Sequence, residues 1–549
     1  MYKYHKPLSI NVVPDIHYYS HKLGTSGEDF EKETAKSPND LKNNEAILDA
    51  LFRQLKKDDP DIVIFPGDLT YNAEPESHEG AVKLLTDLKN SGKKVYALTA
   101  THDFRGNDKT FSYEGGKHEI DAVKRSKLLE MYSDFGPNEA LAVHQDSMSY
   151  VVQLCDGYRL FALNDDRNHE GSSGFSEDCF RWISAQISQA KKDNQFIIVM
   201  THHPMIAPSP FYKIIAPGDM MGDCDKRCSQ FADMGVCFAL TGHTHMEDVS
   251  YTYSKNGNIF YDITTASPVG YPATYRTLTF DPAERKIHVK SREITEPVSF
   301  ELNGKDLKEH LENKFFGMIR EVIHAAAYDT EKFAKMANSF SVKSELIYRI
   351  AWLIKPIARI LLRLKVKHIA PLSKKETGLK KADYASIKNE KIIDFIVSLV
   401  LNLYAGDAPY TPDSAYYKIT IGTCNVLDSI LSTLGISIGK FLKNATSIRQ
   451  VVEPLLFNAG IPDRNVTLEI YPLYNADNPA PERVTNKSTE CNVSESKKGP
   501  MIIVLTVLIT LILLPLILLY LIFGFLINLA VNHKKMKKKE GKKPDEAKA

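Results

Sequence analysis

Five short motifs between residues 15 and 245 combine carboxylate and imidazole side chains, and each follows an apolar run typical of a buried strand. The motifs are Asp15-Ile16-His17, Gly67-Asp68, His102-Asp103, His202-His203 and Gly242-His243-Thr244-His245. Carboxylate and imidazole bind hard or borderline divalent cations, and two cations about 4 Å apart can clamp a phosphoryl group. A single motif of this kind is common by chance. Five of them in order along the chain, each at a strand end, indicate a two-metal hydrolase.

The elements that would position these motifs alternate between strands and helices. Strand-like runs lie at residues 8–13, 61–65, 94–98, 150–154, 159–163, 196–200 and 236–240. Helical patterns at 40–57 and 175–190 would cover the sheet, and runs at 259–263, 276–280 and 286–294 would add antiparallel strands. Because the carboxyl ends of parallel strands converge on one sheet edge, distant residues can meet there. We therefore predict an α/β domain over residues 1–300 with the motifs at one edge.

The motif series resembles the calcineurin-like metallophosphoesterase superfamily, whose pattern is DxH, GDxx, GNH(D/E), H and GHxH. The resemblance covers roughly residues 8–290 and implies a sandwich of two β-sheets flanked by helices, with two divalent ions such as Mn, Fe or Zn. It implies a first metal bound by Asp15, His17 and His245, a bridging Asp68, and a second metal bound by His202 and His243. His202 is preferred to His203 because the family's ligand stands two residues before a proline, here Pro204.

The reaction that this resemblance implies is the hydrolysis of phosphodiester or phosphomonoester bonds, with a phosphodiesterase preferred. Two bound cations would lower the pKa of a bridging water, so that hydroxide is available for in-line attack. His102 stands at the family's catalytic position and would protonate the leaving alkoxide or stabilise charge, while Asp103 would orient and polarise it. The alternative for His102-Asp103 is a hydrogen-bonded surface pair.

One motif departs from the family pattern. Ala100-Thr101 stands where the family has Gly-Asn, and that asparagine is normally a ligand of the second metal. The threonine hydroxyl lies one bond closer to the backbone, so we expect a weakened second site held by Asp68, His202, His243 and solvent. An alternative function is a non-catalytic binding or scaffold protein on a degenerate phosphoesterase fold. Retention of the other ligands and of His102 favours the enzyme.

Further polar and aromatic residues follow the motifs and could line a substrate groove. They are Tyr18, Tyr19, His21, Phe104, Arg105, Asn164, Asp165 and Asp166. Loop residues of these types are more often simply solvated.

The second half of the chain has a mainly helical sequence pattern. Residues 301–474 are predicted to form a helical domain, with helices at 307–324, 343–365, 391–404 and 414–442, and carry no chemical motif. Within it, residues 346–367 interleave apolar and basic side chains, which fits either a core helix with a solvated basic face or a helix on an anionic membrane surface. Residues 475–500 form a polar linker.

A single-pass membrane anchor is predicted near the C-terminus. Residues 501–531 are an uncharged apolar run, longer than the roughly 20 residues that cross a bilayer as a helix. The Lys-rich tail at 532–549 favours an extracytoplasmic enzyme, whereas scattered cysteines and the lack of a recognisable export signal favour the cytosol. We prefer the extracytoplasmic side and leave the question open. Lys+Arg number 69 and Asp+Glu 68, so bulk charge implies no nucleic-acid role, and protein partners are not identified.

Overall fold

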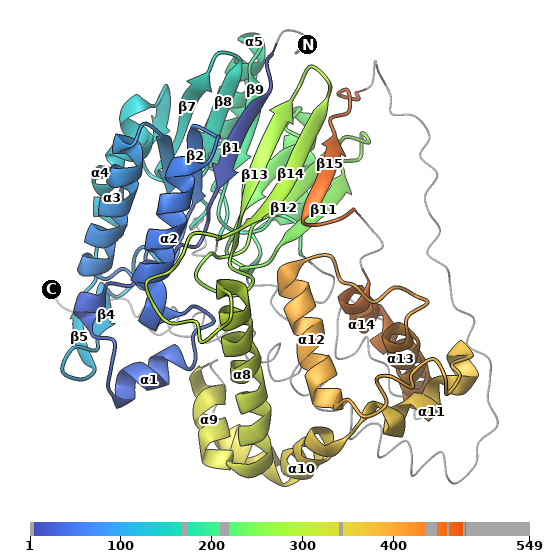
Figure 1. Cartoon of the computed structure of the whole chain (residues 1–549). Coiled ribbons are helices and arrows are strands. Elements are labelled where there is room, and N and C mark those ends of the chain that lie inside the picture. Colours follow the sequence, from blue (N-terminus) through green and yellow to red (C-terminus); the bar gives the residue numbers. More distant parts are fainter. Residues whose placement is uncertain are drawn as a thin grey trace, which may run out of the picture.

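Two β-sheets pack face to face, and all but one of their strands come from residues 1–300 (Figure 1). The computed structural model describes residues 5–166, 173–208, 219–339, 344–433, 447–457, 461–475 and 478. The six-stranded sheet has the order β15 (Asn465–Glu469), β14 (Lys286–Glu293), β13 (Thr274–Asp281), β1 (Leu8–Val12), β2 (Ile62–Pro66) and β3 (Lys94–Leu98). The seven-stranded sheet has the order β11 (Asp248–Tyr253), β12 (Ile259–Thr264), β10 (Phe238–Thr241), β9 (Phe196–Met200), β8 (Tyr158–Ala162), β7 (Ser149–Cys155) and β6 (Ala142–His144).

The sandwich forms because the central strands are apolar on both faces. In β2, Ile62 and Ile64 point into the core between the sheets, whereas Val63 and Phe65 point to the outer face. Because both faces of such a parallel strand are buried, its sequence is a continuous apolar run. β1, β2 and β3 are parallel to one another, as are β8, β9, β10 and β12.

Helices cover both outer faces, as the resemblance predicted. α2 (Asn44–Lys57) and α3 (Pro75–Asn90) pack on the six-stranded sheet, and α5 (Glu177–Lys192) and α7 (Cys224–Asp233) pack on the seven-stranded sheet. Smaller elements complete the domain: α1 (Glu28–Thr34), α4 (Arg125–Met131) and the hairpin β4 (Lys109–Ser112) and β5 (His118–Asp121). The predicted α/β fold with sheets flanked by helices is confirmed.

The second half is mainly helical and packs against the first (Figure 1). Its helices are α8 (Leu307–Tyr328), α9 (Thr330–Ser339), α10 (Ser344–Arg363), α11 (Val366–Thr377), α12 (Ile392–Ala405), α13 (Ala415–Thr433) and α14 (Ile448–Leu456). Phe315 of α8 stacks on Tyr271 with ring centroids 6.2 Å apart, and α8 and α12 share one apolar cluster with α2. The helices therefore extend the core of the first domain.

One strand lies inside the stretch 301–474 for which the sequence predicts helices. β15 pairs antiparallel with β14, from Asn465 opposite Lys290 to Glu469 opposite Lys286. The chain therefore returns to the six-stranded sheet after α14. A strand of five residues with one buried side chain has too short an apolar pattern to stand out in the sequence.

Among the described residues, none of the helices is both long and apolar enough to cross a membrane. The predicted anchor at 501–531 and the tail at 532–549 lie outside the described residues, as does nearly all of the linker at 475–500.

Candidate metal centre

The five motifs meet at one edge of the sandwich, where β1, β2, β3, β9 and β10 end. Ligand atoms of Asp15, His17 and His245 lie within 4.8 Å of one another, and so do those of Asp68, His202 and His243. The two groups are adjacent, because Asp68 Oδ2 lies 3.1 Å from His202 Nε2 and 3.9 Å from His17 Nε2. Asp68 therefore stands between them, as expected of a bridging carboxylate.

Five of these six residues have a left-handed backbone. The φ angles are 53° at Asp15, 40° at His17, 51° at Asp68, 66° at His243 and 57° at His245. Such a conformation costs a non-glycine residue on the order of 1 kcal/mol, and it recurs at binding and catalytic sites. The strain indicates that the strand ends are shaped to aim these side chains at a common point.

Two glycines leave room for the ligands. A Cβ on Gly242 would lie 2.4 Å from Asp15 Oδ2, and a Cβ on Gly67, which has a φ of +98°, would lie 2.7 Å from His202 Nδ1. Both glycines of the GD and GHxH motifs are therefore required by close approach to ligand side chains.

Backbone groups hold the ligand side chains in place. Asp15 Oδ2 accepts a hydrogen bond of 2.9 Å from His243 N–H, and Asp68 Oδ1 accepts one of 2.9 Å from His102 N–H. His202 Nδ1 lies 2.9 Å from the carbonyl of Pro66, which can only accept, so Nδ1 carries the proton and Nε2 is left for a cation.

The charge balance of the cluster fits two divalent cations. Burial raises the pKa of Asp15 well above its usual value and lowers those of His17 and His243 well below theirs. Burial opposes ionisation of Asp68 too, but His202 and His102 hold the pKa of Asp68 well below normal. Asp15 Oδ1 is buried and has no hydrogen-bond donor among the described residues. Cations bound to both groups would supply the missing positive charge.

His102 lies beside the first group, with its ring 4.8 Å from that of His17 and perpendicular to it. Its Nδ1 lies 2.5 Å from the carbonyl of Tyr71, so Nδ1 carries the proton and Nε2 is the reactive nitrogen. The role of Asp103 in orienting His102 stays a prediction, and among the described residues no hydrogen bond joins the Asp103 carboxylate to the His102 ring. The Asp103 carboxylate is buried and accepts from the N–H groups of Leu69, Thr70 and Ala100, so it holds the loops after β2 and β3 together.

Ala100 stands where the family pattern has glycine. Ala100 lacks a left-handed φ, and Asp103 N–H closes the turn on the Ala100 carbonyl at 3.1 Å. Alanine therefore fits this turn. Thr101 is half-buried between Ala100 and His102.

His203, which the resemblance set aside as a ligand, pairs with Asp165. Its N–H donates to Asp165 Oδ2 at 2.9 Å, and its Nδ1 lies 3.2 Å from Asp165 Oδ1. The His203 ring packs on that of His243 with centroids 4.3 Å apart. Asp165 therefore holds His203 in place, and His203 packs against the expected metal ligand His243.

The other groove candidates have mainly structural contacts. Tyr19 is fully buried in a small apolar cluster, and Tyr18 and His21 both contact Glu45. Asp166 forms an ion pair with Arg125, Asn164 donates to the Thr99 carbonyl, and Arg105 donates to Asn72. Phe104 is half-buried against the large apolar cluster.

A buried aspartate that the sequence analysis missed positions the loop after His202. Asp262, on β12, accepts hydrogen bonds from Met205 N–H at 2.6 Å, Ile206 N–H at 2.8 Å and the Thr241 hydroxyl at 2.6 Å. Its only sequence signal is an acidic residue inside the apolar run Ile259–Thr264.

Replacing Asp262 by alanine is expected to lower the free energy of unfolding by about 2–5 kcal/mol, because two buried donors and one part-buried donor lose their acceptor. Urea denaturation measures the change. Asp156→Ala, at an exposed turn, is the matched control and should stay within about 0.5 kcal/mol of the parent. An Asp262→Ala protein as stable as the control would refute the role.

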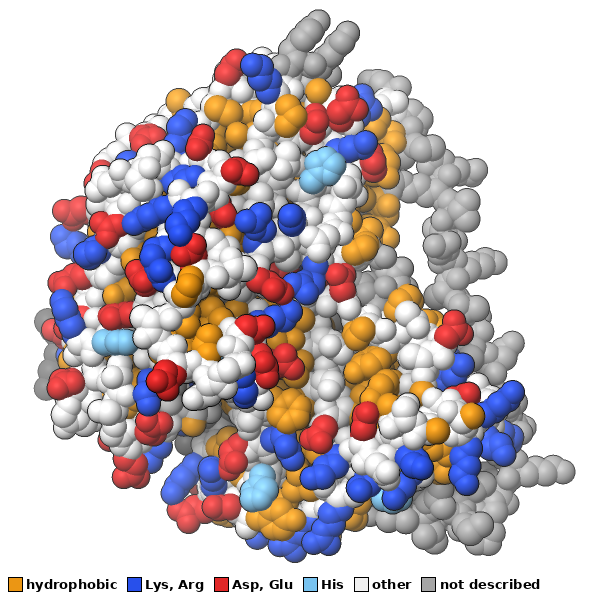
Figure 2. Space-filling model, in the orientation of Figure 1, with side chains coloured by type: hydrophobic (Ala, Val, Ile, Leu, Met, Phe, Trp, Pro, Cys, Tyr) orange, Lys and Arg blue, Asp and Glu red, His pale blue; other side chains and the backbone are white. Residues whose placement is uncertain are grey.

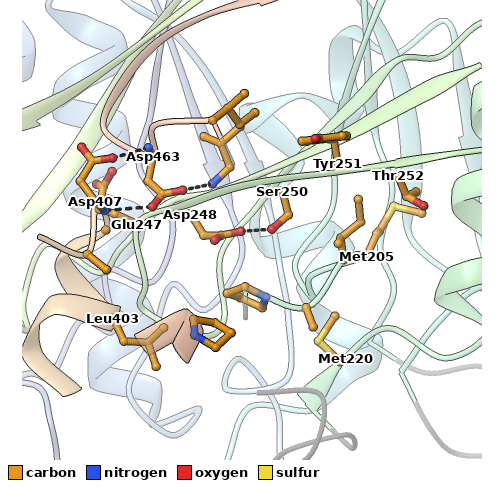
Figure 3. Close-up of a pocket in the computed structure, with 18 of the residues that line it drawn as sticks. Met205, Met220, Glu247, Asp248, Ser250, Tyr251, Thr252, Leu403, Asp407 and Asp463 are labelled. Carbon is orange, nitrogen blue, oxygen red and sulfur yellow. Dashed lines mark hydrogen bonds between the residues drawn. The ribbon is translucent and has the colours of Figure 1, made fainter. Parts of the chain in front are cut away.

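A cavity of about 710 Å³ lies between the sandwich and the helices, next to the loops that carry His203 and His245 (Figure 3). Met205 and Met220 line one side, and Asp407 and Asp463 line the other. Asp463 accepts hydrogen bonds from the N–H groups of Val249 and Asp407, which joins the helical part to β11. Among the described residues, the lining contains six carboxylate residues and no Lys or Arg.

A two-sheet sandwich with two adjacent groups of Asp and His at its strand ends defines a two-metal hydrolase. The family model of the calcineurin-like phosphoesterases matches residues 8–247. This part of the chain belongs to that family, as its motifs predicted, and is the domain of a metal-dependent phosphoesterase.

Several solved structures are similar to the chain at low identity. A dimetal phosphatase from Danio rerio shares 14% identity with a TM-score of 0.39, covering 53% of this chain and 97% of its own. A purple acid phosphatase from yellow lupin (Lupinus luteus) seeds shares 12% with a TM-score of 0.34, covering 53% and 52%. An uncharacterized protein from Streptococcus pneumoniae, described as a predicted phosphoesterase, shares 11% with a TM-score of 0.21, covering 54% and 94%. The family assignment rests on the family model alone. No curated protein matches the chain in sequence.

Proposed function

We propose that this chain hydrolyses phosphodiesters with the help of two divalent cations. The observation that carries the proposal is the pair of adjacent ligand groups with Asp68 between them and His102 beside them. Asp15, His17 and His245 would hold one cation and His202 and His243 the other. Bound there, the cations would activate water and neutralise charge on the phosphate.

The residues around the cations would position the ester and donate a proton to its leaving oxygen. The Tyr71 carbonyl fixes one proton of His102 on Nδ1. In the imidazolium form the second proton, on Nε2, can be donated to the leaving oxygen, which leaves neutral His102 protonated on Nδ1. Asp103 and the backbone it binds keep His102 next to the first group.

The surroundings of the site favour a diester over a monoester. A monoester carries about one more negative charge than a diester near neutral pH and gains more from nearby cationic side chains. Arg105 and Arg125, the arginines closest in sequence to His102, are turned to Asn72 and Asp166 instead. A singly charged diester therefore fits the two-cation site better.

Hydrolysis of nitrophenyl phosphate diesters and monoesters in the presence of Mn²⁺ tests this function. We expect metal-dependent turnover of the diester in excess of the monoester, lost on chelation and in His102→Ala. If no metal-dependent activity appears that His102→Ala abolishes, the chain is instead a binding or scaffold protein on this fold. Faster turnover of the monoester would overturn the diester preference alone.

Thr101→Asn is expected to tighten the second metal site, because the longer amide side chain would add an oxygen ligand. We expect an affinity gain on the order of 10-fold. Calorimetric titration with Mn²⁺ and metal content after dialysis measure it without relying on activity. Thr101→Val, which removes only the hydroxyl, should leave both unchanged. Equal affinities in all three proteins would show that Thr101 does not limit the site.

We also propose that the apolar run at 501–531 anchors the enzyme in a membrane, with the catalytic domain on the extracytoplasmic side. The proposal is supported by the length of that run and by the Lys-rich tail that follows it. Protease added to intact cells should then cleave the catalytic domain. Protection in intact cells, with cleavage after permeabilisation, would place the enzyme in the cytosol.

A further inference from the structure

α10 is amphipathic in the folded protein, with one face packed and the other exposed. Ile347, Ile354 and Ala358 are buried in a small cluster with α8 and α9, and Leu361 is buried in the large apolar cluster. This face gives the helix a fixed orientation on the rest of the molecule. The side chains on the opposite face are therefore held toward solvent as a group.

The exposed face carries two large aromatic rings. Trp352 is 77% exposed and Tyr348 is 53% exposed, one turn apart on the helix. Tyr328, at the end of α8, is 45% exposed and its ring lies 5.4 Å from the Arg359 guanidinium. Burying tryptophan and tyrosine on folding would be favourable, so their joint exposure on one face indicates a contact with something else.

Basic side chains surround these rings. Between Ser344 and Arg363 the helix has four basic residues and one acidic residue, Glu345 in its first turn. Arg349 and Arg363 are exposed and Lys355 is half-buried; none of the three forms an ion pair with another described residue. Figure 2 shows Lys and Arg interspersed with hydrophobic side chains along the lower edge of the molecule, where Figure 1 places α10.

We propose that this face of α10, defined by Tyr348, Arg349, Trp352, Lys355 and Arg363, lies on an anionic lipid surface. Tryptophan and tyrosine are the residues that favour the bilayer interface, and basic side chains on the same helix face are attracted to acidic head groups. The charge of the face selects an anionic partner, and its exposed tryptophan and tyrosine rings suit the interfacial region of a bilayer.

The rest of the chain is compatible with such a contact. The predicted linker at 475–500 would span at most about 90 Å when extended, so an anchor at 501–531 would keep α10 within reach of the bilayer. An anchor alone, however, would not bring Trp352 into the lipid. The position of this side chain therefore tests the α10 contact separately from the anchor and from catalysis.

Trp352 can report on its own surroundings, because the chain has only one other tryptophan, Trp182. The full chain with Trp182→Phe would be reconstituted into phosphatidylcholine vesicles with or without phosphatidylserine. We expect a blue shift of Trp352 emission and quenching by brominated phospholipid in the vesicles that contain phosphatidylserine. Equal emission in both vesicle types would overturn the proposal.

Charge variants locate the effect on α10. Arg349→Gln, Lys355→Gln and Arg363→Gln together should reduce the quenching about fivefold or more. A control variant removes the same charge from the catalytic domain through Lys22→Gln, Lys83→Gln and Lys127→Gln, whose lysine side chains are 73%, 75% and 67% exposed. This control should leave the quenching of Trp352 unchanged. Both sets should hydrolyse a soluble nitrophenyl ester like the parent, which shows that they fold. Equal quenching in the two variants would show that the basic side chains of α10 do not bind the anionic lipid. Shielding of Trp352 from solvent in the absence of vesicles would equally contradict the proposed lipid contact.

Discussion

Asp68→Asn is expected to abolish most of the activity, lowering kcat by about 10³-fold or more, which is about 4 kcal/mol of transition-state stabilisation. The Asp68 carboxylate lies near imidazole nitrogens of both ligand groups, 3.1 Å from His202 Nε2 and 3.9 Å from His17 Nε2. A neutral amide would give up the charge that holds two cations together. Steady-state kinetics with a nitrophenyl diester and metal analysis of the dialysed protein measure both effects.

Asp61→Asn is the matched control for this change. Asp61 is exposed and directly precedes β2, whereas Asp68 follows the other end of the same strand. The control should keep the parental kcat and metal content. An Asp68→Asn protein with full metal content and a kcat within about 10-fold of the parent would contradict a bridging role.

His102→Ala is expected to lower kcat by about 10²- to 10⁴-fold while leaving the metal content unchanged. His102 belongs to neither ligand group, yet its ring lies 4.8 Å from that of His17. If Nε2 protonates the leaving oxygen, the loss should be larger for an alkyl ester than for a nitrophenyl ester, because nitrophenolate leaves without a proton. Parallel kinetics on the two substrates measure the difference.

His118→Ala, at an exposed position on β5, serves as the control for this histidine and should behave like the parent. An equal loss on both substrates would assign His102 to charge stabilisation rather than to proton transfer. Loss of bound metal in His102→Ala would instead make His102 a ligand or a support of one.

Much of the candidate site could be predicted from sequence because its signal is local. Each ligand lies within a few residues of the end of an apolar strand, and parallel strands bring such ends together whatever the rest of the fold does. The choice of His202 over His203 came from the family pattern, and the structure places His202 with Asp68 and His203 with Asp165. The side chains of adjacent loop residues point in different directions because their backbone dihedral angles differ. These angles cannot be deduced from the residue types alone.

A direct contact between the Asp103 and His102 side chains is absent among the described residues for a related reason. Adjacency to His102 suggested a contact between the two side chains, but the turn that begins at Ala100 points the Asp103 carboxylate back to the backbone of Leu69 and Thr70. The Tyr71 carbonyl orients His102 in its place. A backbone acceptor has no residue type, so no sequence pattern could have identified it.

The sequence by itself determined the class of chemistry, the α/β character of the first domain and the helical character of the second half, because ligand types and apolar periodicity are properties of short segments. The two-sheet sandwich followed from the resemblance to the family. Only the tertiary structure decided which groups lie together across the chain. The acceptor role of Asp262 toward Met205, the return of β15 to the sheet and the exposure of Trp352 all depend on contacts between segments far apart in sequence. Such contacts follow from the packing of the whole chain, and no short window of residues contains them.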